Sequence, residues 1–335
     1  MAPLSRALDD LKLAQHGSGI SSSKYTYQGV VDPDWAAGPL PNGGYILCLL
    51  VMAGIKSRRE TKHQDPIHVT AHFVAPTKIS AYEIEIEIIR TGARFTNLSA
   101  NWIQDGEIKV TTHMIFGTLP DFNAPPSSKE YEDIPPSHPL YHHIPILTHP
   151  SDSPLENVDT DRYKFIKHLR RAEDPLIKAR NKAKLTVPAG GLESGLWVEL
   201  VDEDKELALA MFPLFADMFR RTPTLLSQVH GNGNLPKYYP TVLMTLEFKR
   251  RLPRRSSTPN FAKHTLGLYS RGLFLEHGRH DTYCEIWSAP CDLGQAAEEK
   301  QTDKESWRRD MRCIAVTTQM ALTISLNGQK KPAKL

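Results

Sequence analysis

The chain has 335 residues; 40% are hydrophobic, 24% are charged, and 41 Lys and Arg residues against 38 Asp and Glu residues give a formal net charge of +3. This length and apolar content predict a globular protein of about two domains, and so weak a charge bias argues against a nucleic-acid partner. No apolar run reaches the roughly 18 residues of a membrane span, and the four cysteines lack the CxxC spacing of a zinc site. We therefore expect a soluble, intracellular protein without a membrane span.

The first half of the chain predicts one buried helix and an antiparallel sheet. Asn42 is a good N-cap before Gly43 and Gly44, and the almost wholly apolar run at 45–56 predicts a helix that is buried on most sides. Around it, apolar and polar residues alternate with the two-residue period of half-buried strands. The strands that we expect are residues 25–31, 67–73, 82–88, 94–104 and 107–118.

A proline-rich stretch separates this half from the next. Residues 119–186 predict a linker wrapped over the surface, with a charged helical segment near its end that Pro175 interrupts. The tandem His142 and His143 within it are expected to be solvated. We divide the chain into an N-terminal unit at 1–119, a linker at 120–186, a C-terminal unit at 187–328 and a flexible tail at 329–335.

The second unit repeats the order of the first. An apolar run at 206–221 predicts its helix, which Pro213 kinks. The heptad 314–320 matches the heptad 108–114 at five of seven positions, 206 residues apart. This similarity indicates an internal duplication, and we interpret it as a symmetric homodimer fused into one chain with a single working site. The strands that we expect are residues 196–200, 241–248, 264–276, 282–288 and 311–326, with a polar insertion at 289–309.

Three polar residues of the second unit are candidates for chemistry. Asp217 is an ionisable group in an otherwise apolar helix end, where a buried carboxylate is costly unless it has a partner. Its alternative role is an ion pair with Arg220 or Arg221. Thr241 and Gln319 lie on strand faces, and each alone is more often a hydrogen-bonding residue of the core than a catalytic group.

A basic cluster follows the strand that begins at Thr241. Lys249, Arg250 and Arg251 are followed closely by Arg254 and Arg255. The cluster is either a solvated loop or a contact for a phosphorylated ligand, and arginine suits the second role because its guanidinium binds phosphate through two hydrogen bonds. Arg250 and Arg251 are therefore candidate substrate-binding residues.

The order of Asp217, Thr241 and Gln319 resembles that of the acyl-CoA thioesterase II family, which has a tandem, or double, hotdog fold. The helix entry at 42–45 and the segments around Asp217 and Gln319 carry the resemblance, which covers roughly residues 25–117 and 196–326. It implies an α+β fold of two long helices, each wrapped by an antiparallel sheet.

The resemblance also implies an activity, the hydrolysis of acyl-CoA to a free acid and CoA. Asp217, Thr241 and Gln319 would together orient the hydrolytic water, and Gly43 and Gly44 would let a backbone N–H approach the developing oxyanion. This chemistry requires no metal and no organic cofactor.

Two rival functions remain open at this stage. The first is a hotdog hydratase or dehydratase that acts on an enoyl or polyketide-like thioester, for which His72 or His113 would matter more than Gln319. The second is a catalytically silent acyl-binding or scaffold protein, in which Asp217 is merely ion-paired. A homo-oligomer is compatible with each function.

The C-terminal tripeptide gives an expectation about location. Ala333, Lys334 and Leu335 form a one-residue variant of the Ser-Lys-Leu signal that the peroxisomal import receptor reads. We therefore expect a peroxisomal location, with this receptor as a partner, and the cytoplasm is the alternative.

Overall fold

The computed structural model describes residues 3–16, 23–124, 134–157, 164–186, 190–201, 205–231, 237–253, 261–295 and 306–325. The strands of the N-terminal half are β1 Lys12–His16, β2 Lys24–Val30, β3 Ala36–Ala37, β4 Leu40–Pro41, β5 Asp65–Phe73, β6 Ala81–Thr91, β7 Thr96–Gln104 and β8 Glu107–Gly117. Those of the C-terminal half are β9 Leu169–Glu173, β10 Leu192–Leu200, β11 Lys237–Tyr238, β12 Thr241–Phe248, β13 Thr265–Gly272, β14 Leu275–Glu276, β15 Arg279–Ser288, β16 Cys313–Leu322 and β17 Ile324–Ser325.

The helices are fewer and mostly short. The α-helices are α1 Leu4–Asp9, α2 Gly43–Arg58, α3 Pro175–Ala183, α4 Phe212–Ala216, α5 Thr222–His230 and α6 Trp307–Asp310, and the 3-10 helices are η1 Pro33–Trp35, η2 Lys164–His168 and η3 Leu209–Met211. Among the described residues, no helix combines the length and the hydropathy needed to cross a membrane.

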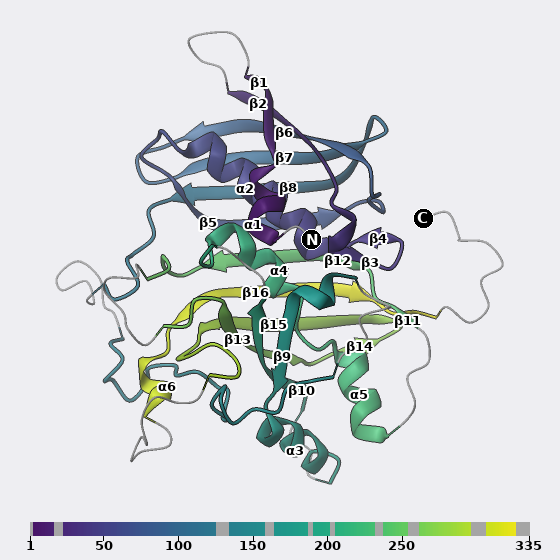
Figure 1. Ribbon diagram of the computed structural model, residues 1–335, viewed down its shortest axis with the longest axis vertical. Helices are drawn as coiled ribbons and strands as arrows, with labels where there is room; N and C mark the ends of the chain where they lie inside the picture. Colours follow the sequence, from purple (N-terminus) through teal and green to yellow (C-terminus); the bar gives the residue numbers. More distant parts are fainter. Residues whose placement is uncertain are drawn as a thin grey trace.

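One antiparallel sheet runs through both halves of the molecule. In the described part of the chain it has thirteen strands, in the order β1-β2-β6-β7-β8-β5-β12-β16-β15-β13-β10-β9, with β14 paired to β15. Figure 1 shows the N-terminal half above and the C-terminal half below, joined where β5 lies beside β12. Outward from this pair, β5, β8, β7, β6 and β2 mirror β12, β16, β15, β13 and β10, so the strand order confirms the predicted duplication.

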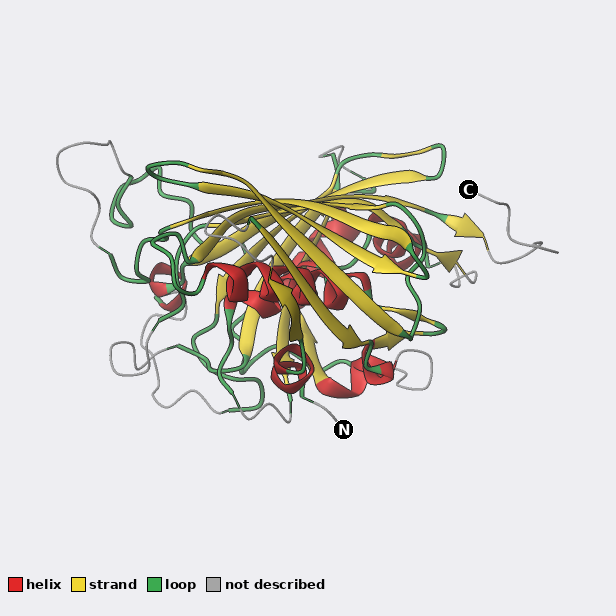
Figure 2. Ribbon diagram, turned by 90° about the horizontal axis from the view of Figure 1, so that it is seen from above, coloured by secondary structure: helices red, strands yellow, loops and turns green. Residues whose placement is uncertain are grey.

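Helix α2 forms the centre of the main core, as the sequence predicts. Its N-cap Asn42 accepts a hydrogen bond at Oδ1 from the Tyr45 N–H at 3.0 Å, and most of its side chains are buried because it packs against β5, β6, β7 and β8. Figure 2 shows helices lying on the concave side of the curved sheet. The helix is apolar on nearly all sides because the sheet and η3 and α4 together surround it.

The predicted long helix of the second unit is wrong. The chain instead forms η3 and α4, pauses at Asp217, and starts α5 at Thr222. Pro213 stands in the first turn of α4, where its missing N–H costs nothing, so it starts a helix that the sequence analysis expected it to kink. Pro223 begins α5 in the same way.

The proline-rich linker is more ordered than the sequence predicts. Its residues 169–173 form β9, which extends the sheet beside β10, and Pro175 begins α3 after the N-cap Asp174. Its residues 144 and 146 are buried in a second core on the convex face of the C-terminal half, together with Trp197, Trp287 and Trp307. His142 is largely exposed but contacts the buried Glu285 carboxylate at 2.9 and 3.0 Å.

The register of the central strands corrects the predicted match between the two heptads. Thr70 faces Thr245 across the β5–β12 pair, and their neighbours on β8 and β16 are His113 and Thr318. His113 is therefore the counterpart of Thr318 on the exposed face and not of Gln319. The sequence match is one residue out of step, and a slip of one residue moves every side chain to the other face.

Candidate active site

Asp217 receives four hydrogen bonds from both halves of the molecule. Its Oδ1 accepts from Gln319 Nε2 at 3.0 Å and from Arg221 NH2 at 3.2 Å. Its Oδ2 accepts from Asn42 Nδ2 and from the Gly44 N–H, each at 3.3 Å. Every partner is a donor, which is the pattern that an ionised carboxylate accepts. Asp217 is only 6% exposed, so these four donors replace the water molecules that would otherwise solvate its carboxylate.

The end of α4 fixes Asp217 against the start of α2. Asp217 is the C-cap of α4 with φ −104° and ψ 2°, in the sparsely allowed bridge region where active-site residues are often found. A Cβ at Gly44 would lie 2.6 Å from the Pro213 carbonyl oxygen and 2.9 Å from the Asp217 Cβ. Glycine is therefore required for this close approach, and the positive end of the α2 dipole faces the carboxylate.

Gln319 joins Asp217 to Thr241. Its Nε2 donates to Asp217 Oδ1 and also to Thr241 Oγ1 at 2.9 Å. The side chain is 4% exposed, and within the described residues its Oε1 has no hydrogen-bond partner. One amide thus fixes two of the three predicted site residues and keeps an acceptor free beside them.

Thr241 reaches this cluster because strand β12 contains a bulge. Thr241 pairs with Ala321 on β16, and the register shifts between Thr241 and Leu243. In a regular strand Val242 would occupy the concave face two residues before Met244, but the bulge gives that place to Thr241. Regular alternation along 241–248 predicts that Thr241 lies on the face opposite to Met244, and the bulge makes this prediction wrong.

The symmetric position in the N-terminal half holds no comparable polar group. Met114 pairs with Val69, one residue before Thr70, just as Gln319 pairs with Met244, one residue before Thr245. By the same symmetry Pro66 and Phe116 correspond to Thr241 and Ala321. Apolar residues therefore occupy the equivalents of Gln319 and Thr241, and the polar cluster occurs once in the described fold.

Of the other predicted residues, the structure brings the two glycines to the site and keeps the two arginines away. Gly43 and Gly44 begin α2 beside Asp217. Arg250 and Arg251 follow the far end of β12; Arg250 donates to the carbonyl oxygens of residues 313 and 122, and Arg251 makes two hydrogen bonds to Asp65. Arg254 and Arg255 lie outside the described residues.

Two residues enter the site in roles that the sequence analysis did not assign. Asn42 was predicted only as a helix cap, yet its amide nitrogen also donates to Asp217. Arg221 was the alternative partner of Asp217, and the ion pair exists within the candidate site, so the two interpretations hold together. Arg220, the other suggested partner, pairs instead with Glu156 and Glu173. A cap followed by two glycines is the sequence signal that could have identified Asn42.

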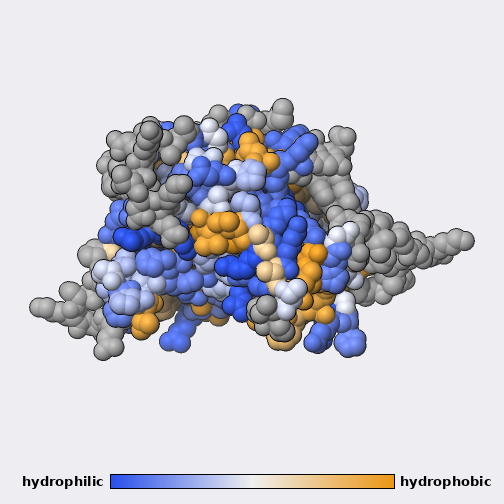
Figure 3. All heavy atoms as spheres, turned by 90° about the horizontal axis from the view of Figure 1, so that it is seen from below, coloured by the Kyte–Doolittle hydropathy of each residue, from blue (hydrophilic) through white to orange (hydrophobic). Residues whose placement is uncertain are grey.

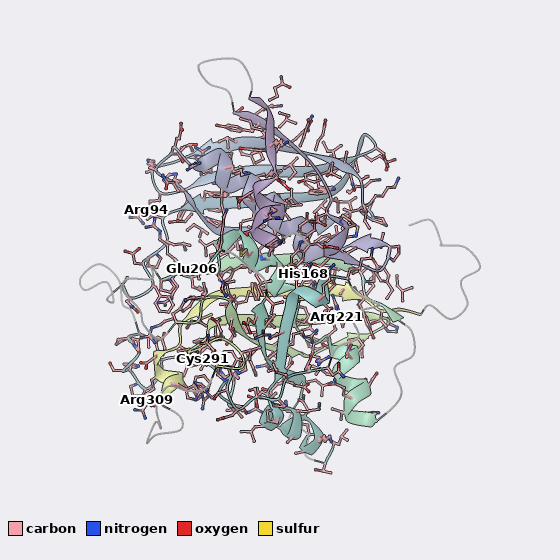
Figure 4. The ribbon with its side chains drawn as sticks, in the orientation of Figure 1. Arg94, His168, Glu206, Arg221, Cys291 and Arg309 are labelled. Carbon is pink, nitrogen blue, oxygen red and sulfur yellow. The ribbon has the colours of Figure 1, made fainter. Side chains whose placement is uncertain are left out.

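The surroundings of Arg221 extend the site along the concave face. In Figure 4, Arg221 lies close to the junction of the two halves, whereas Arg94 lies at the periphery. Its guanidinium stands 5.9 Å from the centre of the Tyr239 ring, and the other neighbour of that ring is His280, with 5.9 Å between ring centres. Burial and the positive charge of Arg221 lower the pKa of His280 to about 4.

A surface depression of about 280 Å³ opens beside the site, between α3 and α5. Thr222, which directly follows Arg221, lines this depression together with Gly272. The apolar residues that line it include Leu226 and Leu273. Figure 3 views the molecule from the end at which α3 and α5 lie and shows small hydrophobic patches on a largely hydrophilic surface.

Comparison with known proteins agrees with this architecture. Residues 31–117 match the family model of the acyl-CoA thioesterase N-terminal domain. No curated protein matches the chain. A similar solved structure is a candidate thioesterase II from Thermobifida fusca, with 20% identity and a TM-score of 0.62 over 96% of this chain and 99% of that chain. A second is a hotdog-fold protein of unknown function from Alicyclobacillus acidocaldarius, with 18% identity and a TM-score of 0.64 over 98% of this chain and 99% of that chain. A third is the acyl-CoA thioesterase II TesB2 from Mycobacterium marinum, with 13% identity and a TM-score of 0.59 over 97% of this chain and 100% of that chain.

At these identities the solved structures establish the fold, and the family model establishes the class of the N-terminal unit. Both agree with the resemblance that the sequence analysis describes. The match of residues 31–117 to the acyl-CoA thioesterase N-terminal domain supports a thioester hydrolase, and the described residues have the predicted double hotdog fold.

Proposed function

We propose that Asp217, Thr241 and Gln319 hold and activate the water with which this protein hydrolyses acyl-CoA to a free acid and CoA. The observation that carries the proposal is the Gln319 amide, whose Nε2 bridges Asp217 and Thr241 at 3.0 and 2.9 Å. Within the described residues its Oε1 remains a buried acceptor without a partner.

A water at this position has three complementary partners. It donates one hydrogen to the Asp217 carboxylate and the other to Gln319 Oε1. The Thr241 oxygen already accepts from Gln319, so its own hydrogen is directed to the water oxygen. With both hydrogens engaged, a lone pair of the water faces the thioester carbon. This is the arrangement that general-base catalysis requires.

The reaction then follows from these contacts. The water oxygen attacks the carbonyl carbon while Asp217 takes the proton, which gives a tetrahedral intermediate with a negative oxygen. When the intermediate collapses, the C–S bond breaks, the acyl group is released as the free acid, and the CoA sulfur leaves with the electron pair as a thiolate. Asp217 returns its proton to the thiolate or to solvent.

The start of α2 is our candidate for stabilising the negative oxygen. The Gly44 N–H is engaged by Asp217, so of the two predicted glycines only Gly43 offers a backbone donor. The Gly43 N–H makes no hydrogen bond to the described residues, and Gly43 lies beside the Asp217 carboxylate. A preorganised N–H at a helix start is well suited to an oxyanion.

The geometry favours hydrolysis over hydration or dehydration. His72 and His113, the residues on which that chemistry would depend, lie on the exposed face of the sheet. Asp217 and Gln319 are buried on the opposite, concave face.

The test is product analysis with a panel of short to long acyl-CoAs. CoA release, followed with a thiol reagent, should accompany formation of the free acid, and in ¹⁸O-water the acid should carry one new oxygen. Hydrated or dehydrated acyl-CoA without CoA release would establish the rival reaction. Ligand binding without any release, by protein shown to be folded, would establish the acyl-binding alternative.

We further propose that the chain is imported into peroxisomes through Ala333, Lys334 and Leu335, which lie outside the described residues. A fluorescent protein fused to the N-terminus should colocalise with a peroxisomal marker and should become cytoplasmic when these three residues are removed. A cytoplasmic full-length fusion would contradict this proposal.

A further inference from the structure

Besides Gln319 Oε1, three polar side-chain atoms of the strands on the concave face of the C-terminal half are buried without a partner among the described residues. They are Ser194 Oγ, Ser270 Oγ and His280 Nε2, and their residues are 4%, 1% and 2% exposed. Ser194 faces Ser270 across the β10–β13 pair, and Ser270 faces Cys284 on β15. His280 lies four residues before Cys284 on the same strand and therefore on the same face.

His280 is the one of these three that adjoins the catalytic cluster. Thr241 pairs with Ala321 on β16, and Ala321 pairs with His280 on β15. Two strand spacings separate Thr241 from His280, about 10 Å between backbones. Ala321, which lies between them, has a small side chain, whereas Phe116 stands at the symmetric position in the N-terminal half.

The chemistry of His280 limits what a ligand beside it can be. Burial and Arg221 oppose its protonation, so the ring is a neutral hydrogen-bonding group. Its Nδ1 lies 3.4 Å from Thr323 Oγ1, where either atom can be the donor. Nε2 is accordingly a donor or an acceptor, depending on the tautomer. A hydroxyl group complements both tautomers, while a plain hydrocarbon leaves Nε2 desolvated and unpaired.

We propose that the acyl group of the substrate carries a hydroxyl on one of its first carbons and that His280 Nε2 binds this hydroxyl. This inference rests on the proposed hydrolysis at Asp217, which places the thioester carbon beside Thr241. Ser270 and Ser194 continue the polar face away from Thr241 and offer further partners for an oxygenated chain. His280 is thus a specificity-determining residue, and the hydrolytic step itself is unchanged.

The test compares a 3-hydroxyacyl-CoA with the unsubstituted acyl-CoA of the same length. In the wild type, kcat/KM should favour the hydroxylated substrate by roughly two- to twelvefold, the ratio that corresponds to one net hydrogen bond. His280→Leu should abolish or reverse this preference. His280→Asn, which keeps a polar side chain, should retain part of the preference.

His63→Leu is the matched control. His63 is also a buried histidine, but both its ring nitrogens have partners, Thr96 Oγ1 at 3.0 Å and the Ala93 carbonyl at 3.2 Å. It lies past the far end of the 16-residue helix α2, about 24 Å along its axis from Gly43. This variant should melt at a lower temperature than the wild type and keep the wild-type substrate ratio.

The outcomes separate the two proposals. No CoA release from either substrate would refute the hydrolysis and this inference with it. Release with equal kcat/KM for the two substrates in the wild type would leave hydrolysis standing and overturn the hydroxyl site, since Nε2 would then be paired with water. A wild-type preference that survives in His280→Leu would also overturn it.

Discussion

Replacing Gln319 by Met would give the catalytic half the residue that its symmetric half already has. Methionine has nearly the same volume, so the core around Ala321 and Thr282 should accept it with little repacking. The substitution removes the two hydrogen bonds from Nε2 and the free acceptor Oε1. Asp217 keeps three of its four donors, and the water loses one of its three partners.

The two consequences differ greatly in size. A hydrogen bond to a charged group contributes about 1.5–3 kcal/mol and one to a neutral group about 0.5–1.5 kcal/mol, and Asp217 remains compensated by Asn42, Gly44 and Arg221. We therefore expect a melting temperature only a few degrees lower. Turnover should fall by about 100-fold or more, the typical loss when one preorganised group that acts on the transition state is removed.

Gln104→Met is the matched control. Gln104 is equally buried and uses its amide fully, bonding to the Lys78 N–H, the Lys78 carbonyl and Ser80 Oγ at 2.9 Å each. The control should lose stability and keep turnover. Steady-state CoA release and thermal melts measure both quantities. A folded Gln319→Met enzyme with turnover close to that of the wild type would refute the assignment of Gln319 as a water-holding residue.

Three further predictions follow from the same geometry. Thr241→Val should lower turnover by about tenfold or more at an unchanged KM, because the water and Gln319 Nε2 each lose a contact and the substrate loses none. Thr245→Val on the exposed face should not lower turnover, and equal kinetics of the two variants would exclude Thr241 from the site. Gly44→Ala should lower stability by about 1–3 kcal/mol in denaturant melts, since its Cβ would stand 2.6 Å from a carbonyl oxygen of α4, and a neutral effect would contradict the close approach. His280 has a pKa of about 4 in the folded protein, against an ordinary 6.5. Between these two pH values the unfolded chain binds more protons than the folded protein, so stability is lost as pH falls through this window, by at most about 3 kcal/mol. His280→Leu should therefore lose less stability than the wild type from pH 7 to pH 4, and an equal loss would contradict the shift.

Much of the first hotdog unit follows from the sequence because its local signals agree. The apolar run after Asn42 predicts a buried helix, and the alternation at 82–88 predicts a half-buried strand. In the second unit the apolar run at 206–221 gave the same signal. Pro213 and Pro223, however, each start a new helix, and a proline that starts a helix cannot be told from one that kinks it until the packing is known.

The site was predictable in part, and for a different reason. The order of Asp217, Thr241 and Gln319 resembles a known family, but residue types alone do not show that one amide joins the other two groups. The bulge that turns Thr241 to the concave face has no sequence signature, because it is a matter of pairing with β16. Arg250 looked suited to phosphate, yet its donors bond to carbonyl oxygens of the chain.

Repeat similarity also needs the register of the sheet before it can be interpreted. The two heptads match at five of seven positions, yet this match aligns residues on the exposed face of one strand with residues on the buried face of the other. Only the pairings of Thr70 and Thr245 show that Gln319 corresponds to Met114. The inference of one working site therefore stands on Met114 and Pro66, the apolar counterparts of Gln319 and Thr241.

The most direct test of the account is CoA release by Asp217→Asn, compared with the wild type and with Asp65→Asn. Asp65 is also a partly buried carboxylate paired with an arginine, Arg251, but it lies away from Gln319. We predict that turnover by Asp217→Asn falls by roughly two or more orders of magnitude, as expected for the loss of a general base, while Asp65→Asn retains it. A folded Asp217→Asn protein that hydrolyses acyl-CoA as fast as the Asp65→Asn control would contradict the central claim.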